Sequence, residues 1–187
     1  MIYEPIRVER FGSIRIEVYP DDDADNPRDM YEPLGTLVEW HRRMDFGDQK
    51  APRTLEGEWA VLDFFGVNEG DVFLPVYIYQ HGHATISVKP FGDRWDSGQV
   101  GWIFAKEDRL KDLGYTRKGA EKELTREVEE LDTYIRGDYY YVRILKLEKC
   151  ESCGKTDEEL VDAYGQLTAN DVESIIEEYK YKAEVKD

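Results

Sequence analysis

The sequence predicts an α+β fold, with a mostly antiparallel sheet, two or three packed helices and a further helix at the C-terminus. In the first half of the chain, segments that alternate apolar and polar residues, as half-buried strands do, are joined by short turns. Later segments instead repeat apolar residues at helical spacing. Because strands and helices do not alternate strictly, a parallel α/β fold is disfavoured.

The predicted strands are short and bounded by turn residues. Pro20 ends the first of them, and the third and fourth form a hairpin whose turn contains His81 and His83. The last strand alternates side chains toward two faces, which is typical of a sheet with one buried face. The six segments are residues 13–19, 35–40, 74–79, 85–88, 100–104 and 139–147.

Four segments have the apolar spacing of helices. They are residues 54–65, residues 106–113, a segment through residues 124–135, and one that begins near Thr168. Gly114 and Gly137 are expected to end the second and third. Thr168 and Asp171 predict a capping box, with Asp in place of the usual Glu. The buried stripe of the last helix is expected at Val172, Ile175, Ile176 and Tyr179.

The composition is that of an acidic globular protein. Of 187 residues, 41% are hydrophobic and 13% aromatic, enough to build a core. The 25 basic and 41 acidic side chains give a net charge of -16, which disfavours direct nucleic-acid binding and docking on an anionic membrane. No apolar segment approaches the roughly 20 residues that span a bilayer, and the first residues lack a signal-peptide pattern. We therefore expect a soluble, cytoplasmic protein.

The length suits one ordinary domain with a small extension. Residues 1–150 are expected to form a single α+β domain. Residues 151–187 are expected to form an acidic C-terminal extension whose helix packs on that domain.

Three histidines, at positions 41, 81 and 83, are candidate metal ligands. His81 and His83 could share a metal ion with an aspartate, which would fit a metal-dependent hydrolase. The helix-borne pair of histidines found in many zinc enzymes is absent. We therefore favour turn and surface positions for these residues, without a metal, and the hydrolase stays open as the alternative function.

Cys150 and Cys153 form a Cys-x-x-Cys pair followed by Gly154. A structural zinc site needs two more soft ligands, and the chain contains no second pair of cysteines. A redox motif would stand at the start of a helix. We therefore expect a turn between strands that binds no zinc, and no cofactor is expected elsewhere.

The segment between Trp95 and Trp102 holds turn-forming residues between two large aromatic side chains. Asp96 and Ser97 are expected to bond backbone amides, while both indoles enter the core. The segment lacks the nucleophile elbow of hydrolases and the glycine pattern of phosphate-binding loops. The predicted structural turn consists of Trp95, Asp96, Ser97, Gln99 and Trp102.

Two segments concentrate the acidic charge. Residues 21–32 hold six acidic and one basic side chain, and residues 157–187 hold ten and three. The first could hold a hard cation, but it lacks the glycine and the distal glutamate of an EF-hand loop. We expect these segments to bind a basic partner. They would attract it electrostatically, and the range of that attraction falls as the salt concentration rises. The predicted partner-binding residues are Asp21, Asp22, Asp23, Asp25, Glu173, Glu177 and Glu178.

Several segments together resemble a family of small acidic proteins encoded by phages and mobile elements, mostly of Gram-positive bacteria. The most distinctive is Trp95-Asp96-Ser97-Gly98-Gln99-Val100-Gly101. The resemblance implies no catalytic activity, and the chain departs from the family in residues 154–187. The other matching segments are residues 21–28, 34–43, 46–48, 74–79 and 127–138.

Taken with the charge, this resemblance suggests a phage accessory protein that acts in the host cytoplasm. We expect it to bind and block a host protein that has a basic or nucleic-acid-binding surface. One inhibitor of this kind would be a DNA mimic directed against restriction or CRISPR machinery. The 16 net negative charges of the chain approach the charge density of duplex DNA, which is about one charge per 1.7 Å. A homodimer is compatible with this expectation.

Overall fold

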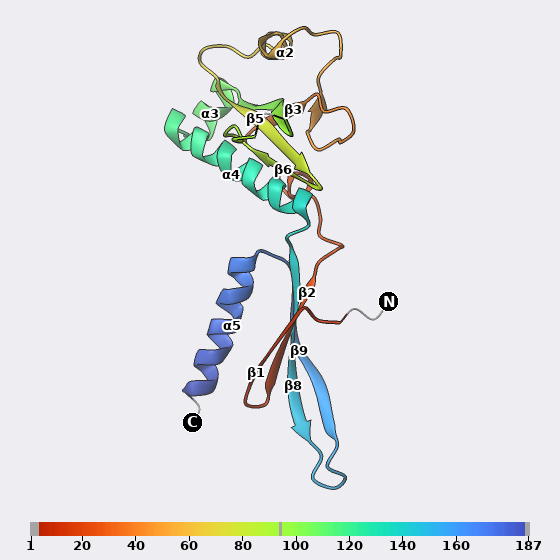
Figure 1. Cartoon of the computed structure of the whole chain (residues 1–187). Helices are drawn as coiled ribbons and strands as arrows, with labels where there is room; N and C mark the ends of the chain where they lie inside the picture. The colour runs from red at the N-terminus through yellow and green to blue at the C-terminus, as the bar shows by residue number, and fades with distance from the viewer. Residues whose placement is uncertain (1–3, 94, 186–187) are drawn as a thin grey trace. The chain divides into compact units, whose positions relative to one another are not determined.

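The computed structural model describes residues 4–93 and 95–185, which form nine strands and five helices (Figure 1). These elements make two compact units. Unit 1 combines the two ends of the chain, up to Asp25 and from Gly137 onward, and unit 2 is Asn26–Arg136. Each unit contains one mostly antiparallel sheet, so the predicted α+β class is confirmed.

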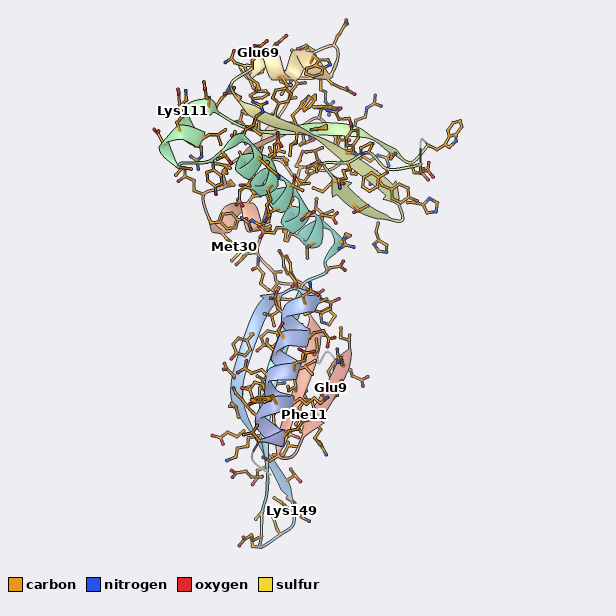
Figure 2. The ribbon with its side chains drawn as sticks, turned by 90° about the vertical axis from the view of Figure 1, so that its left-hand side faces the viewer. Glu9, Phe11, Met30, Glu69, Lys111 and Lys149 are labelled. Atoms are coloured by element: carbon orange, nitrogen blue, oxygen red, sulfur yellow. The ribbon has the colours of Figure 1, made fainter. Side chains whose placement is uncertain are left out.

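Unit 1 is a four-stranded antiparallel sheet with one helix along one of its faces (Figure 2). The strand order is β1-β2-β8-β9, so that β1 and β9 are the edge strands. The elements are β1 (Arg7–Phe11), β2 (Ile14–Pro20), β8 (Tyr140–Lys149), β9 (Thr156–Leu167) and α5 (Ala169–Glu184).

The core of unit 1 lies between β2, β8 and α5. Ile16 and Ile144 from the sheet pack against Val172 and Ile176 from α5, all of them buried. The predicted stripe of α5 is confirmed, with Ile175 and Tyr179 partly buried beside that core. Its predicted capping box is also present, because the side chains of Thr168 and Asp171 each accept the other's backbone N–H.

Unit 2 is a five-stranded sheet of order β4-β3-β7-β5-β6, with helices on both faces (Figure 1). All pairs are antiparallel except β3 with β4. The strands are β3 (Thr36–Glu39), β4 (Gln49–Lys50), β5 (Val72–His81), β6 (His83–Ser87) and β7 (Ser97–Ala105). The helices are α1 (Pro27–Met30), α2 (Glu58–Phe64), α3 (Glu107–Asp112) and α4 (Arg117–Arg136).

Alternation along β7 gives unit 2 two separate hydrophobic clusters. Ile103 points into a cluster with Leu124 and Val128 of α4. Trp102 and Phe104 point to the other face, into an aromatic cluster below α2. Because successive side chains of a strand point to opposite faces, both faces of β7 are buried, each in its own core.

The structure divides the chain differently from the expected boundary after residue 150. Residues 150–155 connect β8 to β9, which pair along their whole length. The strand β9 was not predicted, because its polar and apolar residues do not alternate, and residues 156–165 are all exposed, Leu160 and Val161 among them. Residues 7–11, which form β1, were also not predicted as a strand.

The predicted helices differ from the observed ones mainly at their ends. The one expected from residue 54 begins at Glu58, after Gly57 with φ of +93°. Gly114 and Gly137 follow α3 and α4 in the left-handed conformation, as predicted. In residues 4–93 and 95–185, none of the helices combines the length and apolar character needed to cross a bilayer.

Candidate functional site

The predicted acidic loop follows β2 and is fastened to the end of β9. A carboxylate oxygen of Asp21 accepts the backbone N–H of Gln166 at 2.6 Å. The Gln166 side chain in turn bonds the backbone N–H and C=O of Asp25, at 3.3 and 2.9 Å. Gln166 has φ of +54°, a left-handed conformation that is unusual for a residue other than glycine. Asp21 therefore holds the loop in place.

Beside this loop lies a pocket of about 590 Å³, which we name the acidic pocket. Tyr19 and Tyr141, opposite each other on β2 and β8, contribute rings whose centroids are 6.4 Å apart. The pocket is lined by Tyr19, Pro20, Asp21, Asp22, Asp23, Tyr141, Arg143 and Gly165.

Tyr19 is fixed by a buried carboxylate on its own strand. Its hydroxyl donates to Glu17 at 2.8 Å. Burial raises the pKa of Tyr19, and the bond to Glu17 raises it further, so the phenol stays neutral. Arg15 and Arg143 lie 2.9 and 3.6 Å from the same carboxylate group and balance its charge. The charge of Glu17 in the wall of the pocket is therefore neutralised internally.

Asp22 and Asp23 supply unbalanced negative charge to the pocket. Both are exposed, and their carboxylates form no hydrogen bond or ion pair within the part of the chain that the structure describes. A carboxylate without an internal partner, next to two aromatic rings, is suited to receive a cation from outside.

The predicted acidic residues of α5 lie in the same unit but are tied to other groups. Glu173 pairs with Arg7 on β1, the edge strand farthest from β9, and Glu178 pairs with Lys182 one turn along the helix. Glu177 is exposed and has no ion pair among the described residues. The seven predicted residues are thus shared between two places rather than gathered into one cluster.

Sequence reasoning placed the acidic residues of β9 in the acidic segment of residues 157–187 but named none of them as partner-binding. Residues 156–179 contain eight acidic side chains and no lysine or arginine, and half of the eight lie on β9. Glu158 accepts two hydrogen bonds from Arg15, at 2.8 and 2.7 Å, and the Arg15 side chain lowers its pKa. Asp157 and Glu159 have no such partner in the described structure. The uninterrupted acidic stretch was the signal that could have identified them.

The two units share the acidity unequally. Unit 1 holds 20 acidic and 10 basic side chains, a net charge of -10. Unit 2 is larger and holds 21 and 15, a net charge of -6. The field that would attract a basic partner is therefore stronger around unit 1.

The predicted burial of both indoles is right for Trp102 and wrong for Trp95. Trp102 is 5% exposed and donates its indole N–H to the carbonyl of Glu58 at 2.8 Å. Trp95 is 96% exposed. The cause is Asp93, whose carboxylate accepts the backbone N–H groups of Trp95 and Asp96, at 2.8 and 3.3 Å. The residue that organises the turn therefore lies three positions before the predicted Asp96.

The other residues of the predicted turn make local contacts. The Ser97 hydroxyl donates to the carbonyl of Asp93, and Gln99 donates to the carbonyl of Gly101 at 3.2 Å. Asp96 lies 2.9 Å from Nδ1 of His81. The segment is a structural turn, but Asp93 organises it in place of Asp96.

The three histidines lie in unit 2, and Asp96 is the carboxylate that contacts His81. His81 and His83 are opposite each other at the end of the β5–β6 hairpin, and His41 accepts the backbone N–H of Met44 at 3.1 Å. Across residues 4–93 and 95–185, no three His, Cys, Asp or Glu side chains gather as a metal site would require. The hydrolase alternative therefore stays a prediction.

The cysteine pair lies in the turn between β8 and β9, and both thiols are free. The sulfur of Cys150 is 3.1 Å from the hydroxyl of Ser152. That hydrogen bond, together with bonds from the Cys153 backbone and thiol, lowers the pKa of Cys150 to about 6.

Unit 2 contains a pocket of about 720 Å³ next to α2. Trp40 and Leu55 form apolar walls, and Arg42, Arg53 and Glu58 stand among the lining residues. It offers no acid–base pair or nucleophile for catalysis and carries more basic than acidic side chains, so it does not belong to the acidic surface.

Comparisons with protein families, with curated proteins and with solved structures found no match for this chain. The resemblance to phage-encoded acidic proteins therefore stays a prediction.

Proposed function

We propose that this protein binds a basic segment of another protein through the acidic surface of unit 1, centred on the acidic pocket. The observation that carries the proposal is the pair of unpaired carboxylates, Asp22 and Asp23, beside the rings of Tyr19 and Tyr141. A lysine or arginine side chain fits this chemistry, because a cation is attracted both to carboxylates and to the faces of aromatic rings.

The net charge of unit 1 supports the same partner. A net charge of -10 would speed the encounter with a basic surface, and this attraction would weaken as salt screens the charges. The acidic residues of β9 extend the surface from the loop that Gln166 fastens to this strand. The volume of the acidic pocket, about 590 Å³, falls in the roughly 300–1,000 Å³ range of ligand pockets.

The biological setting that we propose follows the family resemblance. A phage-encoded protein with this surface would bind and inhibit a host protein. If the host surface is one that normally holds nucleic acid, the acidic surface would act as a DNA mimic. In that case, duplex DNA and this protein should compete for the same captured host protein.

A direct test uses a fluorescently labelled lysine-rich peptide and a glutamate-rich peptide of equal length. We expect anisotropy to show binding of the first only, at about 0.1 M NaCl, and its loss near 1 M, where the Debye length falls from about 10 to about 3 Å. Asp22→Asn with Asp23→Asn should weaken the affinity about tenfold, roughly 1.4 kcal/mol. Asp21 stays unchanged, because it holds the loop.

The matched control removes the same charge from unit 2, through Asp112→Asn with Glu129→Gln. Both residues are exposed, and their side chains have no ion pair in the described structure. If the two double variants lose the same affinity, the binding is a general effect of net charge and the acidic pocket is not the site. Tyr141→Leu should also weaken binding, whereas Tyr141→Phe should not, because the ring and not the hydroxyl meets the cation.

A further inference from the structure

The β8–β9 hairpin extends beyond the rest of the sheet in unit 1. β2 pairs with β8 only as far as Lys146, and the last contact is the Leu147 N–H with the carbonyl of Ser13, at 2.7 Å. Beyond this point β8 pairs with β9 alone, through Lys149 and Thr156. Figure 2 shows Lys149 at the far end of the unit, past the end of α5. The turn at residues 150–155 is therefore an open, projecting tip.

Both cysteines of the chain lie in this tip, in a tightly closed turn. The N–H of Cys150 donates to the carbonyl of Lys155 at 2.8 Å, and the N–H of Gly154 donates to the carbonyl of Cys150 at 2.9 Å. Gly154 has φ of +70°, which lets the chain reverse directly after Cys153. Two thiols separated by two residues have the spacing found at tetrahedral zinc sites.

One chain can supply only half of such a site. Zinc in structural sites is almost always held by four ligands, and no third His, Cys, Asp or Glu joins the two thiols among the described residues. This shortage is why the sequence disfavoured zinc. A second copy of the chain removes the shortage, because its tip carries the same two thiols.

We propose that two copies of this chain share one zinc ion, bound by Cys150 and Cys153 of each copy. The four thiols lose four protons on binding, and the product is a zinc ion with four thiolates and a net charge of -2. The tips can approach although unit 1 is acidic, since residues 146–157 hold three basic and three acidic side chains. Lys149 and Lys155 flank the thiols and offset the charge of the site.

Ser152 provides an internal donor to this site. Its hydroxyl is 3.1 Å from the sulfur of Cys150, so it can donate a hydrogen bond to the thiolate once the proton is lost. Such outer partners orient metal ligands and stabilise their charge. The proposal uses a different end of unit 1 from the acidic pocket and does not rest on the proposed function.

The test uses reduced, metal-free full-length protein titrated with zinc while the molar mass is measured by light scattering. We expect one zinc per two chains, and a mass that doubles from 21.9 kDa. Cobalt in place of zinc should give the visible absorption of a tetrahedral thiolate site. Cys150→Ser and Cys153→Ser should each abolish tight binding and dimer formation, with an unchanged circular dichroism spectrum.

The matched control, His81→Ala with His83→Ala, removes the two imidazoles that lie closest together in the sequence and should leave the zinc-bound dimer intact. One zinc per chain at the monomer mass would overturn the proposal. So would a zinc-bound dimer that survives Cys153→Ser, or the absence of binding at micromolar zinc under reducing conditions. The last result would leave the two cysteines as free thiols.

Discussion

Arg28 and Glu127 are 99 residues apart in the chain, and their side chains meet in the interior of unit 2, with Nη1 3.2 Å from Oε2. Arg28 also donates to both carboxylate oxygens of Asp48, each at 2.6 Å, and to the carbonyl of Gly35 at 2.6 Å. Glu127 accepts the backbone N–H of Leu34 at 2.6 Å. One buried guanidinium thus joins α1, the start of β3, the loop before β4 and α4.

Replacing Arg28 by Met should strongly destabilise the protein. The change leaves the buried Glu127 carboxylate without its cation, which typically costs about 3–5 kcal/mol. Urea unfolding followed by circular dichroism measures the loss. Arg117→Met is the control, because Arg117 pairs with Glu121 at 3.8 Å on the surface, where such pairs contribute at most about 1 kcal/mol. Equal losses in the two variants would contradict the role of the network.

Asp71 should make the stability of the protein sensitive to acid. Burial acts to raise its pKa, but hydrogen bonds from the backbone N–H groups of Asn68 and Glu107 and from Lys106 outweigh it, so the pKa is lowered. As the pH falls, the unfolded chain takes up the proton first. The stabilisation by Asp71 is therefore complete above the usual aspartate pKa of about 3.9 and is lost as the pH falls through the lowered value.

Asp71→Asn tests this sign. At pH 7 the variant should lose about 1–3 kcal/mol, because an amide is a weaker acceptor and places its NH₂ group against a donor. The difference from the parent should shrink below about pH 4. The test is to measure the free energy of unfolding of the variant and of the parent protein at several pH values. Asp112→Asn, at an exposed position, is the control and should change the free energy of unfolding by less than about 0.5 kcal/mol at pH 7. A difference for Asp71→Asn that stays constant with pH would refute the linkage.

The two tryptophans of the Trp95–Trp102 segment should behave oppositely. Trp95→Phe should remove most of the fluorescence that acrylamide quenches at this segment and change stability by less than about 0.5 kcal/mol, since its indole is 96% exposed. Trp102→Ala should cost about 3–5 kcal/mol, because it empties a site between Phe73 and Trp59. A large loss of stability in Trp95→Phe would mean that its indole is buried after all.

Two glycines on β7 offer a matched pair of substitutions. A Cβ at Gly101 would stand 2.6 Å from the carbonyl oxygen of Val38 on the paired strand β3, and backbone cannot easily move. Gly101→Ala should therefore cost about 1–3 kcal/mol or more. Gly98→Ala, on the same strand, meets nothing within 4 Å and should be close to neutral. Thermal unfolding of both variants measures the contrast, and equal melting temperatures would disprove the close approach.

Elements with strong local signals were predictable from the sequence. The last helix was found from the Thr168–Asp171 box and its apolar stripe, because capping and helical periodicity act within a few residues. β2 and β8 were found from alternation, which a half-buried strand imposes on its own sequence. The acidity of residues 21–25 and of the C-terminal segment was likewise plain from composition alone.

Tertiary structure decided the rest, because it depends on which distant segments meet. β9 is a strand only because β8 pairs with it, and its exposed side chains carry no periodic trace of that pairing. Trp95 and Trp102 are the same residue type in one short segment, yet the hydrogen bonds of Asp93 turn one indole to solvent while the β7 register buries the other. The acidic pocket depends on the pairing of β2 with β8, which places Tyr19 opposite Tyr141, 122 positions along the chain. The carboxylates beside these rings lie on a loop that Gln166 and the carbonyl of Tyr139 hold in place.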